Sequence, residues 1–98
     1  MFNKLKQVKD LRDKAKQLQN QLAQKTAIAE HDGVSILMDG NQEVLRVEIS
    51  DELMNSGDKA KLETALRDAV NDGHKKIQRV IAEEMRSSGN FNIPGLTD

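Results

Sequence analysis

The chain contains no cysteine, tryptophan or tyrosine, and its 98 residues include only two phenylalanines. The absence of cysteine excludes disulfide bonds, thiolate metal ligands and cysteine nucleophiles. Because Phe2 and Phe91 lie near the two ends of the chain, the core has to be built from Leu, Ile, Val, Ala and Met. Such a core is thin and leaves little material for a deep substrate pocket.

Long apolar runs are also missing. No stretch approaches the roughly 18 consecutive apolar residues of a membrane span, and the first ten residues contain no apolar signal-peptide core. We therefore expect a soluble, unprocessed protein of the cytoplasm. The length is enough for one domain, which we place at residues 1–88. Residues 89–98 contain Gly, Asn, Ser and the only proline, and we expect them to form a flexible tail.

A first helix is predicted for residues 3–25. Apolar residues recur there at spacings of three and four, which places them on one helix face, and from Val8 onward they form a heptad seam. These residues are Leu5, Val8, Leu11, Ala15, Leu18 and Leu22. The segment has no internal Gly or Pro, and its Lys, Gln, Leu and Ala residues are good helix formers.

After this helix the apolar period changes to two, which predicts three short strands. The strand segments are TAIAEH, VSILMD and EVLRVEIS, separated by the turn sequences DG and DGN. Because Asp, Gly and Asn tolerate the positive φ that tight hairpins need, we expect a three-stranded antiparallel meander. Alternation places Val34, Ile36 and Met38 on one face of the sheet. A loop is expected for the following SDELMNSGD.

A second, long helix is predicted from Asp58, which can cap it, to about Ser87. Its apolar stripe comprises Leu62, Leu66, Ala69, Val70, Ile77, Val80, Ile81 and Met85. Gly73 interrupts the helix and indicates either a weak point or a close backbone approach. The helix would be roughly 40 Å long, whereas a compact domain of this length is only about 30 Å across. One helix end must therefore protrude or meet a partner, and we expect a homodimer that buries the surplus apolar surface.

The net charge of −1 hides an uneven distribution. Residues 1–26 carry seven basic and two acidic residues, residues 27–58 carry one and eight, and residues 59–98 carry seven and six. The corresponding net charges are +5, −7 and +1. At 100° per residue, Lys9, Arg12 and Lys16 share one side of the first helix, adjacent to its apolar stripe.

Three interpretations of this basic side remain open. It is a solvated helix face, which is usual for Lys-rich helices, a surface that displaces counterions from nucleic-acid phosphates, or a membrane-surface helix. Interfacial helices tend to carry Trp and several Phe residues, which this helix lacks. A second basic group comprises His74, Lys75, Lys76 and Arg79. Asp72 and Glu83, at i, i+4 spacing from Lys76 and Arg79, offer salt bridges as its simpler explanation.

Signatures of catalysis and metal binding are missing from the sequence. The string SGDK at residues 56–59 lacks the glycines and the following Ser or Thr of a phosphate-binding loop. The carboxylate pairs at residues 51–52 and 83–84 are sequence neighbours, which face in different directions on a helix. The two histidines lack ligand partners at helical spacing. We expect neither an enzyme nor a protein with a cofactor, a metal or a small-molecule substrate.

Four segments together resemble the YbaB/EbfC nucleoid-associated proteins over nearly the whole chain. MFNKLKQVKDLRDKAKQLQNQLAQ resembles the first helix of that family, and VLRVEISDELM resembles its third strand and following loop. LETALRDAVNDGHKKIQ resembles the core of its second helix, with the Asn-Asp pair, and PGL resembles its C-terminal ending. The specificity lies in the combination and order of the segments. Gly73 departs from the Ala that is usual in the family, and the Gly-rich N-terminal stretch is shortened.

The resemblance implies a bacterial cytoplasmic homodimer of tweezer-like outline that binds double-stranded DNA with weak or variable sequence preference. The expected fold is α+β, with a helix, a three-stranded antiparallel meander and a long helix, as an intertwined homodimer. The DNA-binding candidates are Lys4, Lys6, Lys9, Arg12 and Lys16, with Lys75, Lys76 and Arg79 as a second group. The alternative function is a protein-interaction module, in which the heptad seam of the first helix pairs with a foreign helix.

Overall fold

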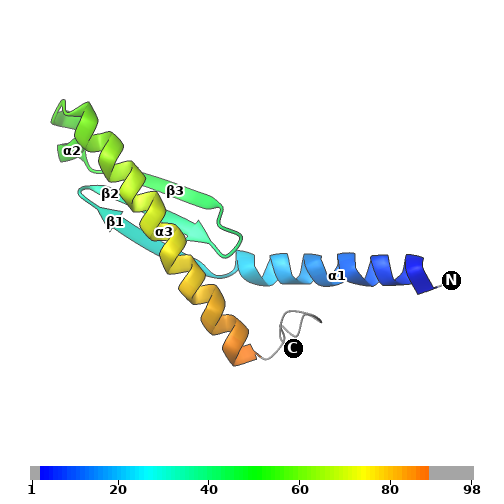
Figure 1. Cartoon of the computed structure of the whole chain (residues 1–98). Helices are drawn as coiled ribbons and strands as arrows, with labels where there is room; N and C mark the ends of the chain where they lie inside the picture. The colour runs from blue at the N-terminus through cyan, green and yellow to red at the C-terminus, as the bar shows by residue number, and fades with distance from the viewer. Residues whose placement is uncertain (1–2, 89–98) are drawn as a thin grey trace.

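The computed structural model describes residues 3–88, in which one long helix packs on a three-stranded sheet and a second long helix projects away from it (Figure 1). The elements follow in the order α1 (Asn3–Ala23), β1 (Thr26–His31), β2 (Val34–Asp39), β3 (Val44–Ile49), α2 (Asp51–Asn55) and α3 (Lys59–Ser88). The predicted α+β arrangement of helix, antiparallel meander and long helix is confirmed. The predicted flexible tail, residues 89–98, lies outside the described residues, and the intertwined homodimer stays a prediction.

The sheet has the strand order β1-β2-β3, and both pairs of neighbours are antiparallel. The β1–β2 hairpin turns at Asp32 and Gly33, whose φ angles of 47° and 94° are the positive values predicted for this turn. The β2–β3 turn differs from the expectation, because its positive φ of 64° belongs to Gln42 rather than to Gly40 or Asn41.

The carboxylate of Asp39 explains the shape of this second turn. Its Oδ1 accepts hydrogen bonds from the backbone N–H groups of Asn41 at 2.9 Å and of Glu43 at 3.0 Å. Because a short side chain satisfies two backbone donors, the chain turns without the paired glycines of a tight hairpin. The β2–β3 register also shifts by a bulge beside Leu37 and Met38.

The predicted loop after β3 was wrong in part, because it contains the short helix α2. Ser50 caps this helix, with its Oγ accepting a hydrogen bond from the backbone N–H of Leu53 at 3.2 Å. Asp51 and Glu52 occupy the first turn, where negatively charged side chains interact favourably with the helix dipole. Leu53 is buried in the core, so α2 closes one end of the sheet.

Helix α3 packs diagonally across one face of β1 and β2 (Figure 1). The buried apolar residues lie between this helix and the sheet, and they are Ala29, Val34, Ile36, Met38, Leu53, Ala65, Ala69 and Ile77. Asp58 caps α3 as predicted, with its Oδ1 accepting from the N–H of Lys61 at 3.0 Å. A Cβ at Gly73 would lie 3.3 Å from the Met38 methyl carbon, so the glycine marks a close approach.

Three parts of the described chain are uncovered: α1, the C-terminal end of α3, and β3. α1 projects away from the sheet, and α3 extends past the sheet at its C-terminal end (Figure 1). The radius of gyration is 18.5 Å and the longest extent is 64 Å, whereas a compact chain of this length has a radius of gyration near 13 Å. On β3, Val44, Leu45 and Val47 remain between 41% and 48% exposed. The structure therefore has the protruding helix end that the sequence predicts.

Candidate nucleic-acid interface

Helix α1 forms an arm of 21 residues whose basic side chains are all exposed. They are Lys4, Lys6, Lys9, Arg12, Lys14 and Lys16. None of the ion pairs found within residues 3–88 includes any of these six side chains. Because no ion pair within the described part of the chain engages them, and α1 carries only Asp10 and Asp13 against six basic residues, their charges are available to a polyanion.

The apolar seam of α1 is also exposed. Leu5 is 85% exposed, Leu11 67% and Val8 49%, whereas Leu18 and Leu22 are half-buried near the sheet. An amphipathic helix derives most of its stability from packing of its apolar face. The outer part of α1 therefore presents a surface suited to a second polypeptide, on the side next to its basic residues.

The arm joins the sheet through the β2–β3 turn. The N–H of Gly40 donates to the carbonyl oxygens of Leu22 and Lys25, each at 2.9 Å, and the Asn41 side-chain amide donates to the Gln19 carbonyl at 3.0 Å. Leu22 is one of the last four residues of α1, whose carbonyls have no partner within the helix, and the bond from Gly40 satisfies its carbonyl. The sequence indicated only a turn residue at Gly40, although its backbone in fact anchors α1.

The second basic group is partly engaged. Lys76 Nζ lies 3.3 Å from Asp72 Oδ2 and 3.4 Å from the carbonyl oxygen of Ile28, so the salt bridge offered by the i, i+4 spacing is formed. His31 Nε2 lies 3.3 Å from the same Asp72 oxygen. Lys75 and Arg79 are exposed and belong to no ion pair within residues 3–88. Lys76 is therefore the candidate whose charge is least available.

Asp72 gives the cluster a pH dependence. Burial alone would raise the pKa of this carboxyl, but hydrogen bonds from Lys76 and His31, together with their positive charges, lower it below its ordinary value of 3.8. A carboxyl group whose pKa is lower in the folded than in the unfolded protein stabilises the fold at pH values above its unfolded-state pKa. This stabilisation is lost as the pH falls through its folded-state pKa. The cluster therefore stabilises the fold at neutral pH and weakens below about pH 4.

We predict that Asp72→Asn lowers the urea midpoint of unfolding at pH 6. The difference from the wild type should be smaller at pH 3, because the contribution of Asp72 is lost as the pH falls below the ordinary carboxyl pKa of 3.8 toward the lowered one. Urea titrations at both pH values measure this, with Asp68→Asn as a matched change on the same helix. An equal difference at the two pH values would contradict the role assigned to Asp72.

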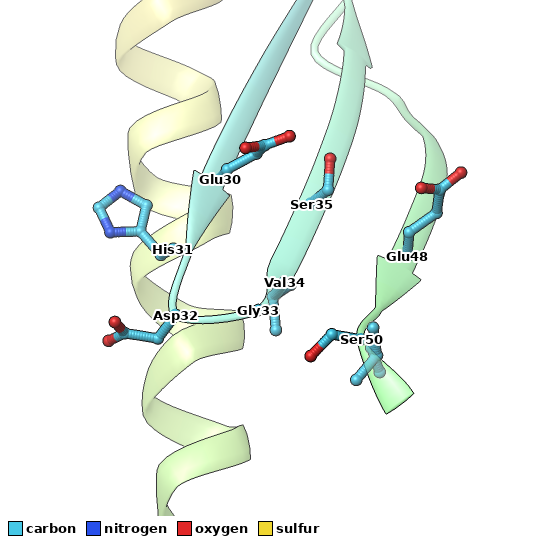
Figure 2. A pocket seen from close by; sticks show the side chains of 9 residues that line it. Glu30, His31, Asp32, Gly33, Val34, Ser35, Glu48 and Ser50 are labelled. Carbon is cyan, nitrogen blue, oxygen red and sulfur yellow. The ribbon is translucent and has the colours of Figure 1, made fainter. Parts of the chain in front are cut away.

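An open hollow of about 520 Å³ lies at the β1–β2 turn. It is lined by Glu30, Asp32 and Glu48, together with His31, Ser35 and Ser50 (Figure 2). Figure 2 shows the carboxylates of Glu30 and Asp32 pointing in different directions. Within residues 3–88, no three His, Asp or Glu side chains are placed so that they could hold one metal ion. Three carboxylates repel phosphate, so this face is unsuited to nucleic acid.

Neither long helix in the described range combines the length and the apolar character that a bilayer crossing requires.

Comparisons with known proteins identify a family, relatives and a solved structure similar to this chain. The family model of the YbaB/EbfC DNA-binding family matches residues 1–90. A nucleoid-associated protein of Syntrophobacter fumaroxidans is 41% identical over 97% of this chain and 89% of its own length. A second one, from Caldanaerobacter subterraneus, is 33% identical over 96% and 87%. A crystal structure of an uncharacterized Helicobacter pylori protein superposes with a TM-score of 0.59, at 25% identity, over 87% of this chain and 95% of that one. The chain therefore belongs to the YbaB/EbfC DNA-binding family.

Proposed function

We propose that this protein binds double-stranded DNA of the bacterial nucleoid as a homodimer, through phosphate contacts with little base readout. Family membership and the names of the relatives support DNA binding. The observation that carries the phosphate contacts is α1, a protruding helix whose six basic side chains are exposed and join no ion pair within the described residues. The first contacts are assigned to Lys4, Lys6, Lys9, Arg12 and Lys16, and Lys75 and Arg79 on α3 supplement them.

The residue types on α1 favour phosphates over bases. Arginine makes the bidentate contacts that distinguish guanine, whereas lysine acts on phosphate as a flexible point charge. Arg12 is the single arginine among the six basic residues of α1. Contacts with phosphates fix the position of a protein on the duplex without carrying sequence information. We therefore expect similar affinity for duplexes of unrelated sequence.

A salt titration tests the phosphate contacts. If each protomer presents about three or four charges, a dimer neutralises about six to eight phosphates, and log K should fall against log salt with a slope of about −5 to −7. Fluorescence anisotropy with two unrelated random duplexes, at several salt concentrations, measures both the slope and the sequence dependence. A slope near zero, or a large preference for one duplex, would exclude this mode of binding.

The homodimer is supported by the uncovered surfaces of the single chain. The seam of α1 and the apolar side chains of β3 are exposed together, and burying them is favourable by about 25 cal/mol per Å². Sedimentation equilibrium at micromolar concentration should give about twice the chain mass of 11.0 kDa. A monomer under these conditions would contradict the proposed homodimer. One molecule would then present half the basic surface.

The exposed seam also favours a second candidate function, a module that pairs α1 with a foreign helix. This function would depend on Leu5 and Leu11, because their side chains are 85% and 67% exposed. In that case Leu11→Gln removes partner binding, while loss of the basic charges matters little. In a DNA-binding protein the basic charges determine affinity directly, and the seam acts only through the dimer.

A further inference from the structure

The base of α1 is joined to α3 through the β2–β3 turn. The main chain of Gly40 and the side chain of Asn41 bond to the last turns of α1. The next residue of the turn, Gln42, contacts α3, where its Oε1 lies 3.0 Å from Nδ1 of His74. Because the Gln amide offers both a donor and an acceptor, this bond can form with either histidine tautomer. The turn therefore bonds to both long helices.

The backbone of Gln42 indicates that its side chain has a role at this position. Its φ of 64° lies in the left-handed region, which glycine adopts freely and other residues adopt at a cost in free energy. A residue held in a costly backbone conformation points to a function of that residue. Within residues 3–88, the one hydrogen bond of the Gln42 side chain is the bond to His74.

A second contact joins the base of α1 to α3 further along that helix. The N–H of Lys25 donates to the carbonyl of Leu22 at 3.1 Å, and its carbonyl accepts from the N–H of Gly40 at 2.9 Å. The Nζ of Lys25 lies 3.1 Å from Glu84 Oε2. Along the axis of α3, His74 and Glu84 are about 15 Å apart. Two contacts at separate points of a helix fix an orientation, whereas a single contact leaves rotation free.

These contacts lie between the two sets of basic residues. Figure 1 shows α1 and the C-terminal half of α3 leaving the same end of the sheet in different directions. Lys75 directly follows His74, and Arg79 lies about one turn further along, with both side chains exposed. Within the described residues no ion pair joins α1 directly to α3. The angle between the two helices is therefore set at the base of α1.

We propose that Gln42 and His74 are positioning residues, which hold the base of α1 on α3 so that the basic residues of both helices contact one duplex at the same time. The positioning role rests on the proposed function and adds how the two basic groups act together. When the angle between the helices is fixed in advance, binding does not have to order α1 on the duplex. When the tie is lost, α1 takes up a range of angles, and simultaneous contact by both groups costs conformational entropy.

Gln42→Gly tests this tie without disturbing the turn, because glycine adopts the positive φ more readily than glutamine does. The urea midpoint of unfolding should stay at the wild-type value or rise, whereas the affinity for a random duplex should fall by about 3- to 10-fold. His74→Leu should weaken binding to a similar extent, and the double variant should bind no more weakly than either single variant. Asn71→Leu, a matched change at an exposed position of α3, should leave the affinity unchanged.

His74→Asn separates the hydrogen bond from the imidazole ring itself. The Asn amide places a polar atom close to the position of Nδ1 and can bond to Gln42, so this variant should keep an affinity near the wild-type value. Both replacements of His74 remove the ring, so any direct contact of the ring with phosphate would be lost equally in both. Equal losses of affinity in His74→Asn and His74→Leu would contradict the positioning role, and so would wild-type affinity in Gln42→Gly.

A distance measurement follows the orientation of α1 without DNA. Because the chain has no cysteine, spin labels can be attached at Asp13→Cys on α1 and Gln78→Cys on α3, two exposed positions. Labelled protein is diluted with excess unlabelled protein, so that pulsed electron paramagnetic resonance reports distances within one chain. The distance distribution should broaden when Gln42→Gly is added, and an unchanged distribution would overturn the proposal. If the wild type does not bind random duplexes, the proposed DNA binding itself is wrong, whereas the distance measurement still decides whether the tie holds α1.

Discussion

Changing Lys9, Arg12 and Lys16 together to Gln should weaken binding to random duplex DNA by about 100-fold or more near 0.1 M salt. The three side chains share one side of α1 and are exposed. A dimer of this variant loses six charges, so the salt slope should flatten by about five. Glutamine is a good helix former, which keeps α1 intact while removing its charge.

A matched variant separates this local effect from the loss of net charge. Lys59, Lys61 and Arg67 are three exposed basic residues in the first turns of α3. Changing these three to Gln alters the net charge of the molecule by the same amount and should leave the slope nearly unchanged. The comparison requires that both variants be folded by circular dichroism and dimeric by sedimentation. If the α1 variant binds DNA with the wild-type affinity and the wild-type slope of log K against log salt, the assignment of the phosphate contacts is wrong.

The second large effect is expected from Gly40→Ala, which should lower the free energy of unfolding by about 2–4 kcal/mol. A Cβ at this position would clash with the backbone carbonyl oxygen of Leu22. The residue has no positive φ, so the new methyl group acts through this contact rather than through backbone strain. To make room, the turn has to move away from α1, and the hydrogen bonds from the Gly40 N–H to Leu22 and Lys25 are weakened.

Urea unfolding followed by circular dichroism measures the change at Gly40. Gly73→Ala is the matched control, because its Cβ would meet only the flexible end of the Met38 side chain at 3.3 Å, followed by atoms at 3.9 Å. There the higher helix propensity of alanine offsets the contact, and the change should stay within about 1 kcal/mol. Equal unfolding midpoints for Gly40→Ala and the wild type would show that the α1 junction tolerates the methyl group.

The elements that the sequence predicted well are those defined by local periodicity and capping. The three- and four-residue spacing of Leu5, Val8 and Leu11 is a property of α1 itself, and Asp58 caps α3 through a backbone donor three residues away. α2 escaped prediction because a helix of five residues has too few turns to show a period. Ser50 followed by two acidic residues is the signal that could have identified it.

The parts that could not be predicted depend on contacts between distant segments. Gly40 is a turn residue by sequence, and its anchoring of Leu22 appears only when α1 meets the sheet. The basic residues of α1 were identifiable as a charged helix face, whereas the engagement of Lys76 requires the carbonyl of Ile28, which lies 48 residues earlier. The uncovered edge of β3 likewise follows from the diagonal path of α3, which no local pattern encodes.

In mechanical terms α1 is a lever whose fulcrum is the β2–β3 turn. Its 21 residues make a rod of about 30 Å, and the described hydrogen bonds that join it to that turn lie at Gly40 and Asn41. A rotation of about 10° at the fulcrum moves the far end of such a rod by about 5 Å, more than the rise of one base pair. In the proposed dimer, two such levers would follow duplexes of different width or curvature through small torsional changes at their bases. If the proposed contacts hold, the tolerance of the protein for DNA geometry resides at Gly40, which joins Leu22 at the base of the helix, about 9 Å from Lys16 and about 27 Å from Lys4 along the helix axis.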